Sequence, residues 1–74
     1  KELREIVNDA IDKLSEEHKT VIVLRELQGL SYEEISNIIN CPEGTVKSRI
    51  NRARSALKNI LKSKKELFDK DYVK

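Results

Sequence analysis

Eight basic side chains lie in one stretch of the sequence that holds no acidic residue. Between residues 44 and 65 they are Lys47, Arg49, Arg52, Arg54, Lys58, Lys62, Lys64 and Lys65. Lysine and arginine donate charge-assisted hydrogen bonds to phosphate oxygens, and in the major groove of DNA they also donate to guanine. A basic face that is merely solvated is the plainer explanation. So dense a run of cations without one acid nevertheless favours nucleic-acid binding.

The rest of the chain has the opposite charge. Residues 1–43 contain ten acidic residues against five Lys or Arg, a local net charge of −5, whereas the whole chain carries +2. Phosphates therefore attract one part of the molecule and repel the other. This asymmetry predicts a DNA-binding segment joined to a body that stays away from the duplex.

Apolar residues within the basic stretch recur with helical spacing, which gives the stretch an inner and an outer face. The inner positions are Val46, Ile50, Ala53 and Leu57. The outer face carries Lys, Arg, Asn and Ser side chains, whose donors and acceptors match those of base edges. We predict base contacts from Lys47, Ser48, Asn51 and Arg52. Contacts to the DNA backbone are predicted for Gly44, Thr45, Arg49, Arg54 and Lys58.

The elements that must position these residues are helices, because the hydrophobic period is helical along the chain and no segment reads as a strand. We predict an all-α fold of four helices, roughly over residues 2–14, 16–28, 32–39 and 43–62. The last two are separated by a short turn, and the second of them is basic. This is the pattern of a helix-turn-helix, whose second helix enters the major groove.

Residues at the predicted helix ends favour these boundaries. Ser15 can cap the second helix, and Gly29 can supply the left-handed residue that stops it. Ser31 and Glu34 have the spacing of a capping box. Pro42 ends the third helix, because proline disfavours helical geometry in the residue before it.

Length limits the organisation of the chain to one small domain. We predict that this domain covers residues 1–62 and that residues 63–74 form either a helix extension or a frayed tail. The chain contains no Met and opens directly into a helical pattern, so we interpret it as a piece of something longer.

Three segments of the sequence form a specific pattern. They are Leu14-Ser-Glu-Glu-His-Lys19, Val23-Leu-Arg-Glu-Leu-Gln-Gly-Leu-Ser-Tyr-Glu-Glu-Ile35 and Cys41-Pro-Glu-Gly-Thr-Val-Lys-Ser-Arg-Ile-Asn-Arg-Ala-Arg54. Together they resemble region 4 of bacterial RNA polymerase sigma factors of the extracytoplasmic-function group, over residues 1–62. Two positions depart from that family: Ser15 stands where a Pro is frequent, and Asn51 lies at a variable position, so its base preference is not inherited.

The resemblance implies a function and a set of partners. The last helix would bind the minus-35 promoter element, with Lys47, Ser48, Asn51 and Arg52 facing the groove and Thr45, Arg49 and Arg54 contacting the backbone. The chain would thus provide sequence-specific binding to double-stranded DNA within a sigma factor that directs RNA polymerase to promoters in transcription initiation. The other helices would dock the flap of the polymerase β subunit, and an anti-sigma factor would be a second protein partner. We expect a monomer.

Residues 1–43 carry more large aliphatic side chains than a core this small can bury. The candidates are Leu3, Ile6, Val7, Ile11, Ile22 and Val23. Surplus apolar surface marks a partner site, so we predict a protein-partner face that includes Ile22 and Val23.

No catalysis, cofactor, metal or small-molecule substrate is expected. His18 has no nucleophile to activate, and with Cys41 it cannot make a zinc site. A single cysteine excludes an intramolecular disulfide, and Cys41 is interpreted as a small buried hydrophobic residue. The longest apolar run, residues 21–24, is too short to span a membrane, and no signal peptide is visible, which favours a cytoplasmic protein.

Two alternative functions remain open at this point. One is a transcription regulator of the response-regulator type, whose helix-turn-helix domain usually dimerises through its last helix. The basic outer face of residues 43–62 offers no second apolar stripe for such a dimer. The other is a helical protein-docking module without DNA contact, which should not bind a random duplex even at low salt.

Overall fold

Helices account for the whole of the fold. The computed structural model describes the backbone of residues 2–72 and the side chains of residues 2–63. Its elements are α1 (Leu3–Asp12), α2 (Glu16–Ile22), η1 (Val23–Leu27), α3 (Tyr32–Ile39) and α4 (Glu43–Tyr72). No strand occurs among residues 2–72. The predicted all-α fold is therefore confirmed, with α3 and α4 forming the helix-turn-helix.

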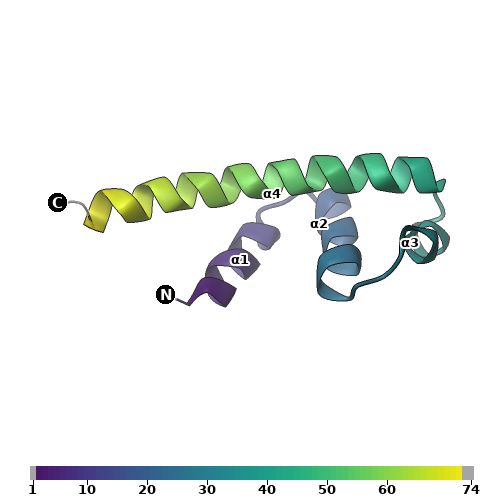
Figure 1. Cartoon of the computed structure of the whole chain (residues 1–74), viewed down its shortest axis with the longest axis horizontal. Coiled ribbons are helices and arrows are strands. Elements are labelled where there is room, and N and C mark those ends of the chain that lie inside the picture. Colours follow the sequence, from purple (N-terminus) through teal and green to yellow (C-terminus); the bar gives the residue numbers. More distant parts are fainter. Residues whose placement is uncertain (1, 73–74) are drawn as a thin grey trace.

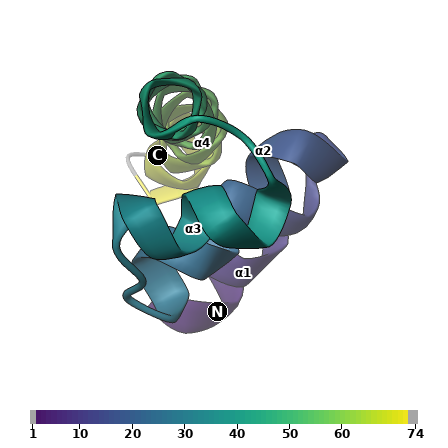
Figure 2. The same ribbon diagram turned by 90° about the vertical axis from the view of Figure 1, so that its right-hand side faces the viewer.

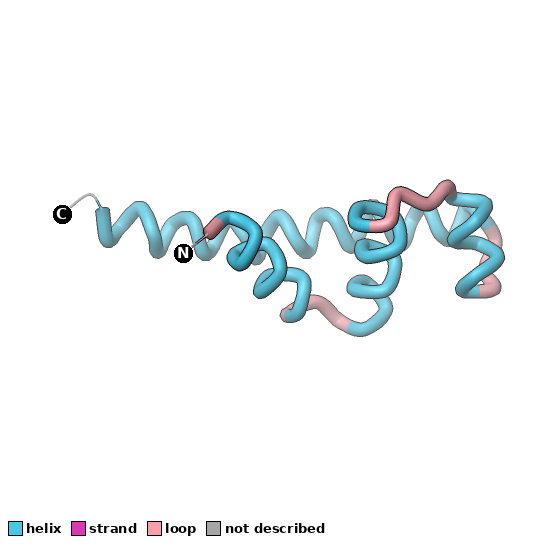
Figure 3. The backbone as a smooth tube through the Cα atoms, turned by 90° about the horizontal axis from the view of Figure 1, so that it is seen from below, coloured by secondary structure: helices cyan, strands magenta, loops and turns pink. Residues whose placement is uncertain are grey.

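The long helix α4 is the element on which the others pack. α1, α2 and α3 lie side by side along one side of it, and its C-terminal part continues past them (Figure 1). The view along α4 shows the three shorter helices together beneath it (Figure 2). Short connections join the helices (Figure 3). The most extensive contact between two helices is that of α2 with α4, so α2 is the main support of the basic helix.

The core lies between α4 and the three shorter helices, and it is apolar. The side chains that are almost completely buried are Ala10, Ile11, Leu14, Val21, Ile22, Ile35, Val46, Ile50 and Ala53. The three buried residues of α4 are those predicted for its inner face, and Leu57 packs against them as a half-buried residue. Two large apolar residues lie on the surface instead: Leu3 is 76% exposed and Ile38 is 59% exposed.

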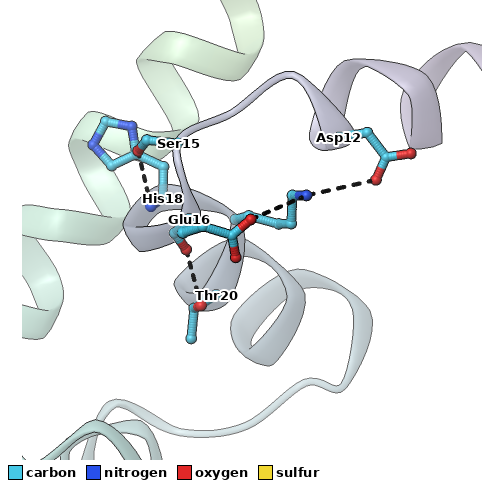
Figure 4. Close-up of polar contacts among 6 residues, drawn as sticks. Asp12, Ser15, Glu16, His18 and Thr20 are labelled. Carbon is cyan, nitrogen blue, oxygen red and sulfur yellow. Dashed lines mark hydrogen bonds and ion pairs between the residues drawn. The ribbon is translucent and has the colours of Figure 1, made fainter.

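The start of α2 is fixed by its own side chains. The Ser15 hydroxyl accepts a hydrogen bond from the backbone N–H of His18 at 3.3 Å, which is the predicted cap. Figure 4 shows this contact beside that of Thr20, whose hydroxyl donates to the backbone carbonyl of Glu16 at 2.9 Å. Lys19 lies 3.9 Å from a carboxylate oxygen of Asp12 and thereby links α2 to α1. These contacts set the direction in which α2 leaves the connection.

The predicted helix over residues 16–28 does form, but its second half is wound more loosely. From Val23 to Leu27 the backbone is a π-helix, and the N–H of Gln28 donates to the carbonyl of Val23 at 3.0 Å. Gly29 then adopts the left-handed conformation with φ of 68°, which confirms it as the stop. The looser turn changes which residues of η1 face α4, because each residue in it advances less than the usual 100°.

The capping box predicted at the start of α3 is present. The backbone N–H of Ser31 donates to the Glu34 carboxylate at 2.8 Å, and the backbone N–H of Glu34 donates to the Ser31 hydroxyl at 3.0 Å. The backbone N–H of Ser31 and, to a smaller extent, the Ser31 hydroxyl beside the carboxylate lower the pKa of Glu34. The ionised carboxylate therefore stabilises the first turn of α3.

Replacing Glu34 with Gln is expected to lower the stability of the domain at neutral pH but not in acid. The folded-state pKa is depressed, so the stability contributed by the carboxylate is present above the unfolded-state pKa and is lost as pH falls through the folded-state pKa. Urea unfolding of both proteins at about pH 7 and about pH 3 measures this. If the urea midpoints of the unmodified chain and the variant differ by the same amount at both pH values, the prediction is contradicted.

The turn between α3 and α4 is held by hydrogen bonds to the last turn of α3. Asn40 takes the left-handed conformation with φ of 58°, a geometry that Asn tolerates better than most residues. The backbone N–H of Cys41 donates to the carbonyl of Ser36 at 3.2 Å, and the Ser36 hydroxyl donates to the carbonyl of Cys41. Cys41 is half-buried and packs against the core, so it is less enclosed than predicted. The bonds through Ser36 fix the start of α4 relative to α3.

The backbone of α4 stays helical from Glu43 to Tyr72, past the predicted end at residue 62. Of the two alternatives for the tail, the structure has the helix extension, while residues 73–74 lie outside the described residues. Among the residues described, no helix is both long and apolar enough to cross a bilayer.

Candidate nucleic-acid interface

The first turns of α4 present their polar side chains away from the core. All four residues predicted to contact bases are exposed: Lys47, Ser48, Asn51 and Arg52. They lie on the face opposite to the buried stripe, because successive residues of an α-helix are about 100° apart. The structure therefore brings them together on one surface that an approaching duplex can reach.

The residues predicted to contact the DNA backbone are not equivalent. Gly44 and Lys58 are exposed, and Thr45 is half-buried. A Cβ atom at Gly44 would meet nothing within 4 Å, so the space around this first turn is open. Arg49 and Arg54 differ from these three residues because acidic side chains of the body already contact them.

Arg49 is paired with Glu17 of α2. Its Nε lies 3.2 Å from a Glu17 carboxylate oxygen, and its side chain is only 22% exposed. The contact is an ion pair without hydrogen-bond geometry, since the buried Nε–H has no acceptor in line among the described residues. The rest of the guanidinium is therefore held at the edge of α4 next to α2.

Arg54 is paired with Glu26 of η1. Its Nε donates to a Glu26 carboxylate oxygen at 2.5 Å, and the side chains are 45% and 41% exposed. This pair is more open to solvent than that of Arg49. Both arginines that we predict to bind phosphate thus carry a carboxylate partner in the absence of DNA.

Arg25 also positions part of the helix-turn-helix, a role that was not predicted from the sequence. It donates from Nη1 to the carbonyl of Leu30 at 2.8 Å, and its guanidinium lies 4.6 Å from the centre of the Tyr32 ring. The residue therefore ties the turn after η1 to the first residue of α3. A lone cation just before a glycine stop is the one sequence signal that could have indicated it, since last-turn cations bind turn carbonyls.

The site holds no arrangement that suggests metal chemistry. Within the described part of the chain, no three His, Cys, Asp or Glu side chains gather as metal ligands would. Its donors are instead lysine, arginine, asparagine and serine side chains on one helix, which suit recognition of nucleic acid by hydrogen bonding.

Comparison with protein families adds the deciding observation. The family model described as sigma-70, region 4 matches residues 4–57, which include α1, α2, α3 and the first half of α4. The chain belongs to this family. The resemblance inferred from the three sequence segments is therefore confirmed.

Two curated relatives of this region 4 domain share one description. The chain is 59% identical over 58 residues to proteins described as ECF RNA polymerase sigma-E factor from Haemophilus influenzae and from Escherichia coli strain K12. The aligned part is 78% of this chain but only 31% and 30% of those relatives. The chain thus spans less than a third of the length of the relatives that it matches.

The predicted protein-partner face of this region 4 domain needs a correction. The prediction that Ile22 lies on an exposed face is wrong, because its side chain is 0% exposed and belongs to the core. The reason is the position of α2, which packs on both α1 and α4 and so buries two successive residues, Val21 and Ile22. Val23 is half-buried and packs against the core. The apolar surface that is exposed includes Leu27, at 59%.

A groove of about 460 Å³ opens between the α2–η1 segment and α4. Its lining residues are Ile22, Glu26, Arg54, Leu57, Lys58, Leu61 and Lys62. Arg54 and Lys58 therefore belong both to the predicted DNA-contacting set and to the wall of an apolar groove.

Proposed function

We propose that this chain is the promoter-reading domain of a sigma factor and binds the minus-35 element of double-stranded DNA during transcription initiation. The observation that carries the proposal is the exposed outer face of α4, in a helix-turn-helix of the sigma-70 region 4 family. The sigma-E relatives support the same assignment. Of the activities in this proposal, DNA binding is the one for which this domain alone should be sufficient.

Specificity in this proposal comes from the exposed residues of the first turns of α4. Arg52 and Lys47 would donate to guanine, Asn51 would pair with adenine, and Ser48 would contact either. Their backbone is held in place by the buried stripe below them and by the Ser36 bonds at the turn. A fixed helix favours specificity, because wrong bases then face donors that cannot move to meet them.

Affinity in this proposal comes from the cations along the edges of α4. Residues 44–65 hold the excess positive charge, whereas residues 1–43 are net negative and repel phosphate. The duplex would therefore approach the outer face of α4 and leave α1 and α2 on the far side. Arg49, Arg54 and Lys58 would contact phosphates next to the groove that the outer face enters.

Binding of this chain to duplex DNA is expected to be weak and to depend strongly on salt. If four or five cations contact phosphates, the logarithm of the association constant falls with the logarithm of salt concentration at a slope of about −4. The dissociation constant should be micromolar or weaker, by order of magnitude, because a single small module makes few contacts. Fluorescence anisotropy with a labelled duplex at several salt concentrations measures both.

The Lys58→Ala variant is the matched control for this titration. Removal of one phosphate contact should reduce the salt slope by about one without changing which sequence is preferred. A salt-independent affinity, or no binding to any duplex at low salt, would favour the alternative of a protein-docking module without DNA contact.

We propose in addition that the domain binds core RNA polymerase through the flap of the β subunit, that an anti-sigma factor is a second partner, and that the chain is a monomer. The family supports these partners, and the exposed side chain of Leu27 and the apolar groove offer surface for them. Retention of core RNA polymerase by the immobilised domain tests the first partner. A polymerase that passes through unretained would contradict it.

A further inference from the structure

Two arginines of α4 lie on opposite edges of its buried stripe. Seen down the helix, positions 49 and 54 fall on either side of the line through Val46, Ile50 and Ala53, because residues advance by about 100° each. Arg49 pairs with Glu17 near the start of α2, and Arg54 pairs with Glu26 in η1. The α2–η1 segment thus holds α4 by one carboxylate on each edge.

The two pairs differ in how easily a duplex can break them. The Arg49 side chain is 22% exposed and its Nε is buried, so that nitrogen stays beside Glu17 whatever binds the outer face. The Arg54 and Glu26 side chains are 45% and 41% exposed, and water reaches both. An ion pair so open to solvent is weak, and another anion can replace its carboxylate.

We propose that Glu26 competes with the DNA phosphates for Arg54 and thereby limits the affinity of the domain for every duplex. The proposal rests on the DNA binding proposed above. A carboxylate oxygen and a phosphate oxygen accept the same kind of charge-assisted hydrogen bond from a guanidinium. The Nε–H that now points at Glu26 cannot point at a phosphate as well, and a phosphate bound by the other guanidinium nitrogens would lie close to the Glu26 carboxylate, which repels it.

The proposal predicts the direction in which Glu26 changes the affinity of the domain for DNA. It does not orient Arg54 toward DNA, since Glu26 belongs to the net-negative body on the side away from the outer face. Its removal frees the whole guanidinium and also removes a negative charge. Because Arg54 contacts the backbone and not the bases, the gain in affinity is the same for preferred and random sequences.

The test is a double-mutant cycle on the 74-residue chain, with the variants Glu26→Gln, Arg54→Ala and the two combined. The association constant for a labelled duplex is measured by fluorescence anisotropy at fixed low salt. Glu26→Gln alone is expected to tighten binding about two- to fivefold, the range of an exposed ion pair. In the Arg54→Ala background the same substitution is expected to have no effect beyond that of the charge control.

The charge control is Glu5→Gln, which changes the net charge equally at an exposed site on α1. The proposal is overturned if Glu26→Gln weakens binding or leaves it unchanged, or if it tightens binding equally with and without Arg54. Circular dichroism on each variant checks that the fold is retained. Failure of the underlying function looks different, because the unmodified chain would then bind no duplex at low salt, which overturns both proposals.

Discussion

Replacing Ile22 with Asp is expected to unfold the domain and abolish its binding to DNA. The side chain is 0% exposed, and no buried polar or charged side chain lies among the described residues to pair with a new carboxylate. Burial of an unpaired carboxylate costs far more than one side chain contributes to folding. A domain of 74 residues has a total stability of about 4–11 kcal/mol, so the substitution should exceed it.

Leu27→Asp is the matched control, because it also replaces an aliphatic side chain with a carboxylate, five residues further along, at a residue that is 59% exposed. That variant should keep its helical circular dichroism and its affinity for duplex DNA. Ile22→Ala should fall between the two, with a loss of about 2–5 kcal/mol in urea unfolding. A folded Ile22→Asp variant that still binds DNA would show that Ile22 is not part of the core.

Replacing Arg52 with Ala is expected to relax sequence preference, whereas replacing Arg54 with Ala should weaken binding to all duplexes alike. Arg52 is exposed on the outer face, where a good contact to a base is worth about 1–3 kcal/mol of discrimination. That corresponds to a loss of about 5- to 150-fold in preference over a random sequence. Arg54 lies at the edge of α4, where a phosphate contact positions the helix without reading bases.

Binding selections from a randomised duplex library, followed by titration of the selected and random sequences, measure both effects. Ser55→Ala is a suitable control, because Ser55 is exposed on α4 and has no predicted contact. Equal losses on selected and random DNA for Arg52→Ala would make Arg52 a phosphate contact. A loss of preference for Arg54→Ala would place Arg54 in the groove.

Local signals in the sequence were enough to predict the helices and most of their ends. The cap at Ser15, the capping box of Ser31 and Glu34 and the stop at Gly29 all depend on residues within a few positions of one another. The inner stripe of α4 was predictable for the same reason, because Val46, Ile50 and Ala53 repeat with the helical period. These features need no knowledge of how the helices pack.

The sequence predictions were wrong where the packing of the helices decides which side chains are buried. Helical spacing alone could not show that α2 is covered on two sides, so Ile22 was assigned to the surface. The π-helix from Val23 to Leu27 leaves no periodic signal in five residues. The sequence also left open whether the helix extends beyond residue 62, because the apolar period fades there while the backbone continues as helix to Tyr72.

The candidate site was predictable as a face but not as an electrostatic arrangement. Basic residues and their spacing indicated which side of α4 faces outward. The partners of Arg49 and Arg54 come from Glu17 and Glu26, far away in sequence, and nothing near either arginine points to them. Which basic side chains are ready to bind phosphate therefore depends on the tertiary structure. Lys47, Arg52 and Lys58 are exposed, whereas Arg49 and Arg54 are already paired with carboxylates.

The packing of α2 against α4 has a consequence for synthesis of the chain. A ribosome releases α1, α2 and α3 before α4, so Val21, Ile22 and Ile35 emerge before the helix that completes their burial. The contact that buries them requires closure of a loop that contains all of α3. The nascent polypeptide therefore stays open until the stripe of Val46, Ile50 and Ala53 has left the exit tunnel. We expect the fold and the helix-turn-helix to form in that same step.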